Sequence, residues 1–118
     1  MESVAFTLRQ NIELLKEMGI SVEEVRSIGG GARSRLWNQI KADVTRLPVV
    51  TLKVEEAASL GLAMLSGVSL KVFKSIEDAC KTMVHFKERY SPKLENIPIY
   101  DRSYRLYIDV YEHLKGLF

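Results

Sequence analysis

The sequence has little of the chemistry that marks redox and metal proteins, since its 118 residues include one cysteine and two histidines. Cys80 has no second cysteine with which to form an internal disulfide, and we expect its thiol to be a small core group. His85 and His113 are far apart and have no cysteine or carboxylate neighbours in a ligand pattern. These absences argue against a zinc site, and we predict no metal ligands in the chain. No nucleophile motif is present either.

Long hydrophobic runs are also missing. The longest mostly apolar run, from Ala57 to Val68, is well short of the roughly twenty residues that span a bilayer. The sequence does not open on a basic segment followed by an apolar one, as a secretory signal does. Its 17 basic and 15 acidic residues are scattered without a basic stripe. We therefore expect a cytoplasmic protein that binds neither nucleic acid nor a membrane.

What the sequence does contain is the composition of one globular domain, 47% hydrophobic and 27% charged. Its most informative stretch is a β-branched run, Val25 to Ile28, that stops at Gly29, Gly30 and Gly31. Apolar residues then return at helical spacing: Leu36, Trp37, Ile40, Val44 and Leu47. This pattern predicts a strand, a glycine-rich turn and a helix. Such a turn lets an anionic or nucleotide ligand approach the backbone, although an ordinary tight turn without a ligand fits the pattern as well.

The flanking segments extend this unit. An amphipathic helix is predicted from Val4 to Met18, with Val4, Leu8, Ile12, Leu15 and Met18 on its apolar face and Gly19 as its C-cap. The helix after the glycines should end before Pro48, and a second strand should run from Val49 to Leu52. Two strands joined by one helix predict a parallel βαβ unit, with a ligand crevice at the carboxyl ends of the strands.

Three further helices are expected in the second half of the chain. The first runs from Glu55 to Ser66 and ends at Gly67, with Glu55 and Glu56 in its first turn and small residues packed closely on the sheet: Ala57, Ala58, Gly61 and Ala63. The second begins at a capping box, Ser75 to Asp78, and its stripe continues to Phe86. The third follows a loop from Ser91 to Pro98 and carries a core-facing stripe: Tyr100, Tyr104, Tyr107, Tyr111 and Leu114.

The segment GGGARSRLWNQIKAD (29–43), the proline-led strand and EAASLGLA (56–63) together resemble the FGGY carbohydrate kinases, and within them most closely the xylulose kinases. The resemblance implies an α/β fold: a helix-rich part of an actin-like, ribonuclease H-like nucleotide-binding domain with two short parallel strands. It covers residues 1–118 as the C-terminal, adenosine-binding part of the second kinase domain. The N-terminal sugar-binding domain would then be absent, which makes the chain a fragment.

By this resemblance, Gly29 and Gly30 back the adenosine and the α-phosphate of ATP or ADP, and Gly31 shapes the turn. Ser34 stands where glycerol kinases often have an asparagine that contacts the adenine, and serine can also cap the helix. Arg33 and Arg35 either shield phosphate charge or simply face solvent. Asp43 lies at the far end of the helix, so we do not expect it to be catalytic.

The implied activity of the intact enzyme is transfer of the γ-phosphate of ATP to a sugar hydroxyl, with D-xylulose as substrate and D-xylulose 5-phosphate as product. The catalytic base, the Mg²⁺ ligands and the sugar site would come from other parts of the enzyme, so we predict that this chain alone is inactive. With its flanking strands missing, it should form homo-oligomers. The alternative is a non-catalytic module that binds a nucleotide or a protein.

Overall fold

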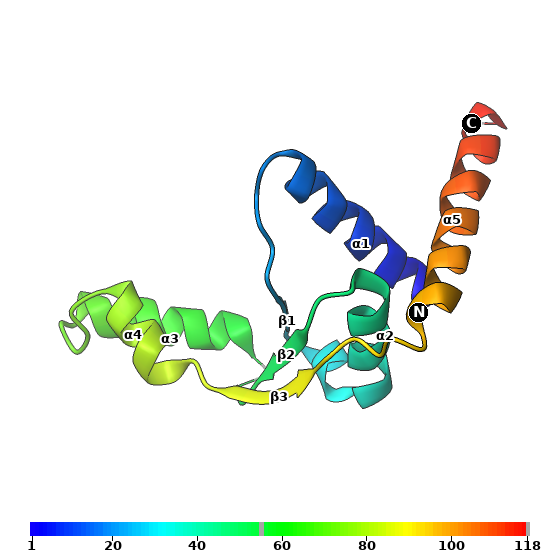
Figure 1. Cartoon of the computed structure of the whole chain (residues 1–118). Coiled ribbons are helices and arrows are strands. Elements are labelled where there is room, and N and C mark those ends of the chain that lie inside the picture. The colour runs from blue at the N-terminus through cyan, green and yellow to red at the C-terminus, as the bar shows by residue number, and fades with distance from the viewer. Residues whose placement is uncertain (55, 118) are drawn as a thin grey trace.

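The computed structural model describes residues 1–54 and 56–117, and these form five α-helices, three strands and two short 3₁₀ turns (Figure 1). In chain order the elements are α1 (Glu2–Glu17), β1 (Val25–Ser27), η1 (Gly30–Arg33), α2 (Arg35–Thr45), β2 (Val49–Leu52), α3 (Ala57–Ser69), α4 (Ile76–Met83), β3 (Phe86–Tyr90), α5 (Ile97–Leu114) and η2 (Lys115–Leu117). The helix-rich α/β prediction is therefore confirmed.

The three strands form one mixed sheet in the order β1-β2-β3. Strands β1 and β2 are parallel, with Val25 opposite Val49 and Ser27 opposite Thr51, which confirms the predicted βαβ unit. Strand β3 runs antiparallel to β2 and was not predicted. Every residue of β2 is buried, because strands on both sides and helix α2 on one face enclose it.

Strand β3 corrects the prediction that the helical stripe of the fourth helix continues to Phe86. Helix α4 ends at Met83, and Phe86 pairs with Leu52 of β2. The pairing is irregular between Val50 and Leu52, where Thr51 Oγ1 accepts a hydrogen bond from the backbone N–H of Glu88 at 3.2 Å. Pairing with strand β2, which is distant in the sequence, decided the conformation here, and the local spacing of apolar residues did not.

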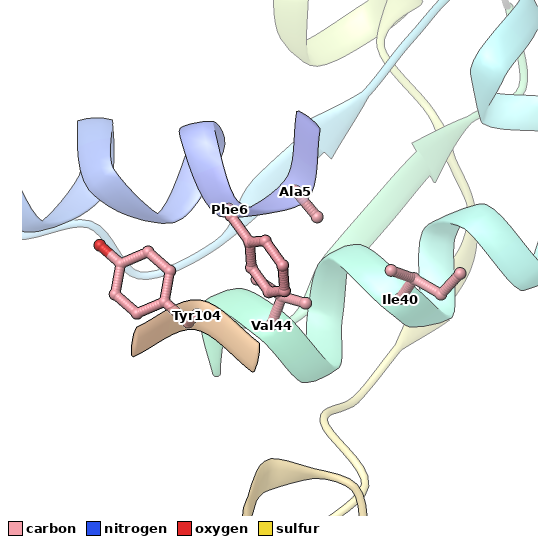
Figure 2. Packing of buried hydrophobic residues seen from close by; sticks show 5 residues of the cluster. All are labelled: Ala5, Phe6, Ile40, Val44 and Tyr104. Atoms are coloured by element: carbon pink, nitrogen blue, oxygen red, sulfur yellow. The ribbon is translucent and has the colours of Figure 1, made fainter. Parts of the chain in front are cut away.

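The main core lies where α1, α2 and α5 meet (Figure 2). Phe6 of α1 points between Val44 of α2 and Tyr104 of α5, and its ring centroid lies 5.8 Å from that of Tyr104. The expected tyrosine stripe is thus partly right: Tyr104 is 8% exposed, whereas Tyr111 is 65% exposed. The stripe leaves the core because α5 extends beyond α1 and α2 in Figure 1.

Helix α1 ends as predicted, but it turns a different face to the core. Gly19 has φ +81°, its N–H donates to the carbonyl of Lys16, and the N–H of Ile20 donates to that of Leu15. These two bonds form a Schellman motif, which closes the helix. The buried residues are Ala5, Phe6 and Ile12. The expected Val4 and Met18 are exposed, because the Phe6 ring rather than the aliphatic stripe sets the contact with α5.

Helices α3 and α4 form a hairpin that projects away from the other helices (Figure 1). Its own small core contains Leu60, Met64 and Ala79, so α3 packs on α4 rather than on the sheet as predicted. Gly67 does not end α3; it is buried inside the helix, where an added Cβ would lie 2.6 Å from the ring of Phe73. Glu56 is the N-cap of α3, and Glu55 lies outside the described residues.

The molecule is elongated, with extents of 55 × 33 × 27 Å and a radius of gyration of 17.6 Å. A compact domain of about 100 residues has a radius of gyration of about 13 Å. Many large apolar side chains are consequently exposed, among them Leu62, Leu65, Leu70 and Val72 of the hairpin region. Among the described helices, none is both long and apolar enough to cross a bilayer.

Candidate functional site

The glycine turn begins directly after β1, at the edge where the carboxyl ends of both parallel strands lie. Gly29 has φ +71° and ψ −168° and precedes the 3₁₀ turn η1, whose first bond runs from the N–H of Ala32 to the carbonyl of Gly29 at 3.0 Å. Helix α2 starts only at Arg35. The expected strand, turn and helix are present, with η1 as an added step between turn and helix.

The three glycines differ in what each position requires. Gly29 alone among them has positive φ, in a region that is essentially restricted to glycine. A Cβ at Gly30 would meet no atom within 4 Å, so its backbone lies open to an approaching ligand. A Cβ at Gly31 would lie 3.5 Å from the indole of Trp37, in ordinary contact. Open space is therefore found at both Gly29 and Gly30, and Gly29 additionally needs the conformational freedom of glycine.

Ser34 is the N-cap of α2. Its backbone is extended, and Oγ accepts a hydrogen bond from the N–H of Trp37 at 3.2 Å, as the sequence indicates for a capping serine. The hydroxyl hydrogen takes no part in this bond. Because Ser34 is exposed, it can cap the helix and donate to a ligand at the same time.

A cavity of about 260 Å³ lies beside the turn. It is enclosed by the residues that follow the glycines, by the end of β2 and by the middle of β3: Ala32, Arg33, Arg35, Thr51, Leu52, Lys87 and Glu88. Three of these side chains are basic and one is acidic. The described lining residues therefore bring several basic groups to the carboxyl edge of the parallel strands, where α/β folds bind their ligands.

The acidic residue of this wall, Glu88, is engaged by its neighbours. Tyr90 donates its hydroxyl hydrogen to Glu88, and Arg35 Nη2 lies 3.2 Å from its Oε1. The hydrogen bond from Tyr90, aided by Arg35, holds the pKa of Glu88 below its ordinary value, while the same bond raises the pKa of Tyr90. Glu88 is thus a carboxylate at neutral pH, and it orients Arg35 at the rim of the cavity.

Asp43 is buried, at 2% exposure, near the end of α2 opposite to Ser34. Its Oδ1 accepts hydrogen bonds from Gln39 and from the backbone N–H of Lys93, and its Oδ2 accepts one from Asn96, all between 2.7 and 2.8 Å. These bonds fasten the segment before α5 to α2. Asp43 therefore has a structural role in these contacts, and its lack of a catalytic role stays a prediction.

Two buried polar residues of α2 beside the turn were not predicted. Asn38 is fully buried and Lys41 is 8% exposed, and strand β3 adds Lys87 and Glu88 to the cavity wall. One signal was available in the sequence. Lys41 lies four residues after Trp37 and three before Val44, so it interrupts the apolar face that these residues form with Ile40. The residues of β3 gave no such signal, because their strand was itself unpredicted.

Mg²⁺ binds oxygen ligands, usually carboxylates. Within residues 1–54 and 56–117 no group of three histidine, cysteine, aspartate or glutamate side chains can hold a metal ion. Glu88, the acidic residue among the described residues that line the cavity, is bound by Arg35 and Tyr90. That the chain supplies no Mg²⁺ ligands stays a prediction, because Mg²⁺ in phosphate sites often takes only one or two carboxylates.

Comparison with known proteins identifies the family of the chain. The model of the C-terminal domain of the FGGY family of carbohydrate kinases matches residues 1–70. The xylulose kinase of Bacillus subtilis (strain 168) is 36% identical over 117 residues, which cover 99% of this chain and 23% of that protein. The chain thus spans about a quarter of the length of this relative.

Solved structures show the same fold. The crystal structure of xylulose kinase from Rhodospirillum rubrum matches with a TM-score of 0.81 and 28% identity, over 98% of this chain and 24% of that one. The structure of Plasmodium falciparum glycerol kinase with ADP matches with a TM-score of 0.75 and 23% identity, over 95% and 22% of the two chains, which is a likeness of fold. With residues 1–70 of 118 matching the family model, the chain belongs to the FGGY family of carbohydrate kinases as a C-terminal domain that resembles those of xylulose kinases.

Proposed function

We propose that this chain forms the adenosine-binding half of an ATP-dependent sugar kinase, with the nucleotide lying on the glycine turn. Gly29 and Gly30 back the adenosine and the α-phosphate, Gly31 shapes the turn, and Ser34 donates a hydrogen bond to the adenine. The observation that carries this proposal is the open backbone of Gly30 at the carboxyl edge of the parallel strands.

The charge beside the turn supports the same ligand. Among the described residues, Arg33, Arg35 and Lys87 line the neighbouring cavity together with Glu88. A nucleotide brings two or three negatively charged phosphates, and guanidinium groups bind phosphate oxygens through short, charge-assisted hydrogen bonds. The cavity is therefore suited to the phosphate side of the nucleotide, while the turn and Ser34 are suited to the adenosine side.

For the intact enzyme we propose transfer of the γ-phosphate of ATP to D-xylulose, giving D-xylulose 5-phosphate, in the cytoplasm. The support is the identity to xylulose kinases over nearly the whole chain. Phosphoryl transfer also needs a group that orients or deprotonates the sugar hydroxyl, and Mg²⁺. We assign these to parts of the enzyme outside residues 1–118, because the chain spans about a quarter of its relatives.

A second candidate is a non-catalytic module that binds a nucleotide or a protein. The exposed apolar side chains of the elongated fold favour a protein partner. The two candidates differ in a coupled assay of ADP release with D-xylulose and Mg-ATP. The kinase proposal predicts no turnover by this chain alone and turnover by a full-length enzyme that contains it. A full-length protein that binds ADP without phosphorylating any sugar would favour the module.

The nucleotide site is tested by titrating ADP into this chain and following the amide signals by NMR. Gly30→Val places a side chain in the open space over the turn and should abolish binding. Ser34→Ala removes the proposed hydrogen bond to the adenine, together with the N-cap bond from Trp37, and should weaken binding about three- to tenfold. Gly61→Val is the matched control. A Cβ at Gly61 also meets no atom within 4 Å, and Gly61 lies in the α3–α4 hairpin rather than in the glycine turn.

Circular dichroism must first show that each variant is folded. The expected order of ADP affinity is parent and Gly61→Val highest, then Ser34→Ala, then Gly30→Val. If folded Gly30→Val binds ADP as well as the parent does, the nucleotide does not lie on the glycine turn.

A further inference from the structure

Two buried polar side chains of α2 hold the glycine turn from opposite ends. On the near side, the Nζ of Lys41 donates a hydrogen bond to Oγ of Ser27, two residues before Gly29. On the far side, Nδ2 of Asn38 donates to the carbonyl oxygen of Ala32 at 2.8 Å, one residue after Gly31. The turn is thus tied to the helix behind it just before and just after the three glycines.

Both Asn38 and Lys41 are buried polar residues that lower the free energy of unfolding relative to apolar residues of similar size. Asn38 is fully buried, and its Oδ1 has no hydrogen-bond partner among the described residues. An unsatisfied buried acceptor lowers the free energy of unfolding, and a leucine of similar volume would avoid that loss. The packing of α2 therefore does not explain an amide at this position.

Lys41 shows the same pattern. It is 8% exposed, and burial lowers the pKa of its ammonium group with no carboxylate among the described residues to offset the effect. Its Nζ lies 5.4 Å from the centroid of the Trp37 ring, and a Cβ at Gly31 would lie 3.5 Å from that ring. Lys41 therefore reaches the turn by two routes, directly through Ser27 and indirectly through Trp37.

We propose that Asn38 and Lys41 are positioning residues that fix the glycine turn in the conformation that receives the nucleotide. The inference rests on the proposed function for its ligand, and on the two hydrogen bonds for its geometry. Glycines are flexible, so a site made from three of them gains affinity when the surrounding structure removes that freedom before binding. Neither residue touches the open face of Gly30, so their effect is on the shape of the turn.

The test compares Asn38→Leu and Lys41→Met with Thr45→Val in this chain. Thr45 is the matched control because it is also buried in α2, and its hydroxyl donates to the carbonyl of Lys41 at 2.7 Å without reaching the turn. Three quantities are measured for each variant: the free energy of unfolding, the amide hydrogen exchange of residues 29–32 and the affinity for ADP.

Asn38→Leu should lower the free energy of unfolding no more than Thr45→Val does, yet speed exchange in the turn and weaken ADP binding, each by at least about tenfold. Lys41→Met should change the turn in the same direction. Thr45→Val should leave both turn measurements unchanged. A structural role alone predicts the reverse, with losses of stability and an unaltered turn.

The proposal is overturned if Asn38→Leu and Lys41→Met leave exchange in the turn unchanged, or if Thr45→Val alters it equally. Should one variant fail to fold, the other decides by the same criteria. If the parent chain does not bind ADP, the proposed function fails in this chain, while the exchange measurements still decide whether Asn38 and Lys41 fix the turn.

Discussion

Nη1 of Arg9 lies 2.7 Å from Oδ1 of Asp101, and this contact joins the first helix to the last across 92 positions of the chain. Arg46, after the end of α2, donates to the other oxygen of the same carboxylate. Glu13 accepts from the Nε of Arg9 at 2.9 Å and also from the hydroxyl of Tyr104. The polar side of the three-helix core is therefore one connected set of charges around Arg9.

Asp101→Ala should lower the free energy of unfolding by about 1–2 kcal/mol, because two guanidinium groups lose a partly buried partner. Chemical denaturation measures the effect. Asp109→Ala, an exposed position of the same helix, is the control and should change stability by less than about 0.5 kcal/mol. Equal effects of the two substitutions would mean that the Arg9–Asp101 contact contributes nothing to stability.

The loss of folding stability at acidic pH should depend on Glu13. Burial acts to raise the pKa of this carboxyl, but hydrogen bonds from Tyr104 and Arg9 outweigh burial and hold the pKa below its ordinary value. The folded pKa is therefore lower than the unfolded pKa of about 4.3. The resulting stabilisation is complete above the unfolded pKa and is lost as the pH falls through the folded one.

Urea unfolding at a series of pH values from about 6 to about 3 measures this loss. Glu13→Gln removes the titrating group and should flatten the profile without abolishing the slope, because the pKa of Asp101 is lowered as well. An unchanged slope in Glu13→Gln would exclude Glu13 as a source of the acid sensitivity.

Asp43→Ala should cost about 2–4 kcal/mol of stability, because three donors lose their acceptor in a buried site. Asp43→Asn should cost about 1 kcal/mol, since its amide nitrogen would face that of Asn96. ADP affinity should be nearly unchanged in folded Asp43→Asn. Thermal unfolding and ADP titration separate the two effects, and a loss of affinity without a loss of stability would contradict the structural role of Asp43.

Gly29→Ala and Gly30→Ala should show at which of the two positions the backbone conformation requires glycine. Gly29 has φ +71°, so alanine there should cost about 1–3 kcal/mol of stability. Gly30 has an ordinary φ and open space over its Cα, so Gly30→Ala should leave stability within about 0.5 kcal/mol. Denaturation curves of the two variants provide the measurement. A destabilised Gly30→Ala would show that this position is constrained by the fold.

The chain should associate in solution, because the outer edges of β1 and β3 and many apolar side chains are uncovered. Light scattering at rising protein concentration should show dimers or larger assemblies. A monomer that persists at the highest concentration would contradict this expectation.

The local signals in the sequence predicted the βαβ unit well. Three glycines, the proline at 48 and a capping serine specify where backbone can and cannot be helical, so β1, α2 and β2 lie within a residue or two of their predicted bounds. Gly19 likewise closes α1. Each of these features depends on the chemistry of a few neighbouring residues, which a single sequence displays directly.

The features that were missed depend on residues far apart in the chain. Strand β3 forms because its residues pair with the edge of β2. Gly67 stays inside α3 because the ring of Phe73 lies against it. The buried positions of Asn38 and Asp43 likewise follow from what covers α2. For the site, the turn and the Ser34 cap were predictable from sequence, but the cavity wall supplied by β3 was not.

The α3–α4 hairpin keeps a core of its own, separate from the cluster that holds α1, α2 and α5. A segment of this kind can open while the rest of the molecule stays intact, because few buried side chains link the two clusters. Thermal unfolding of the chain is then not a single all-or-none event, and one melting temperature does not describe it. Hydrogen exchange in residues 57–83 should report the stability of the hairpin alone, and a protease should cleave there first.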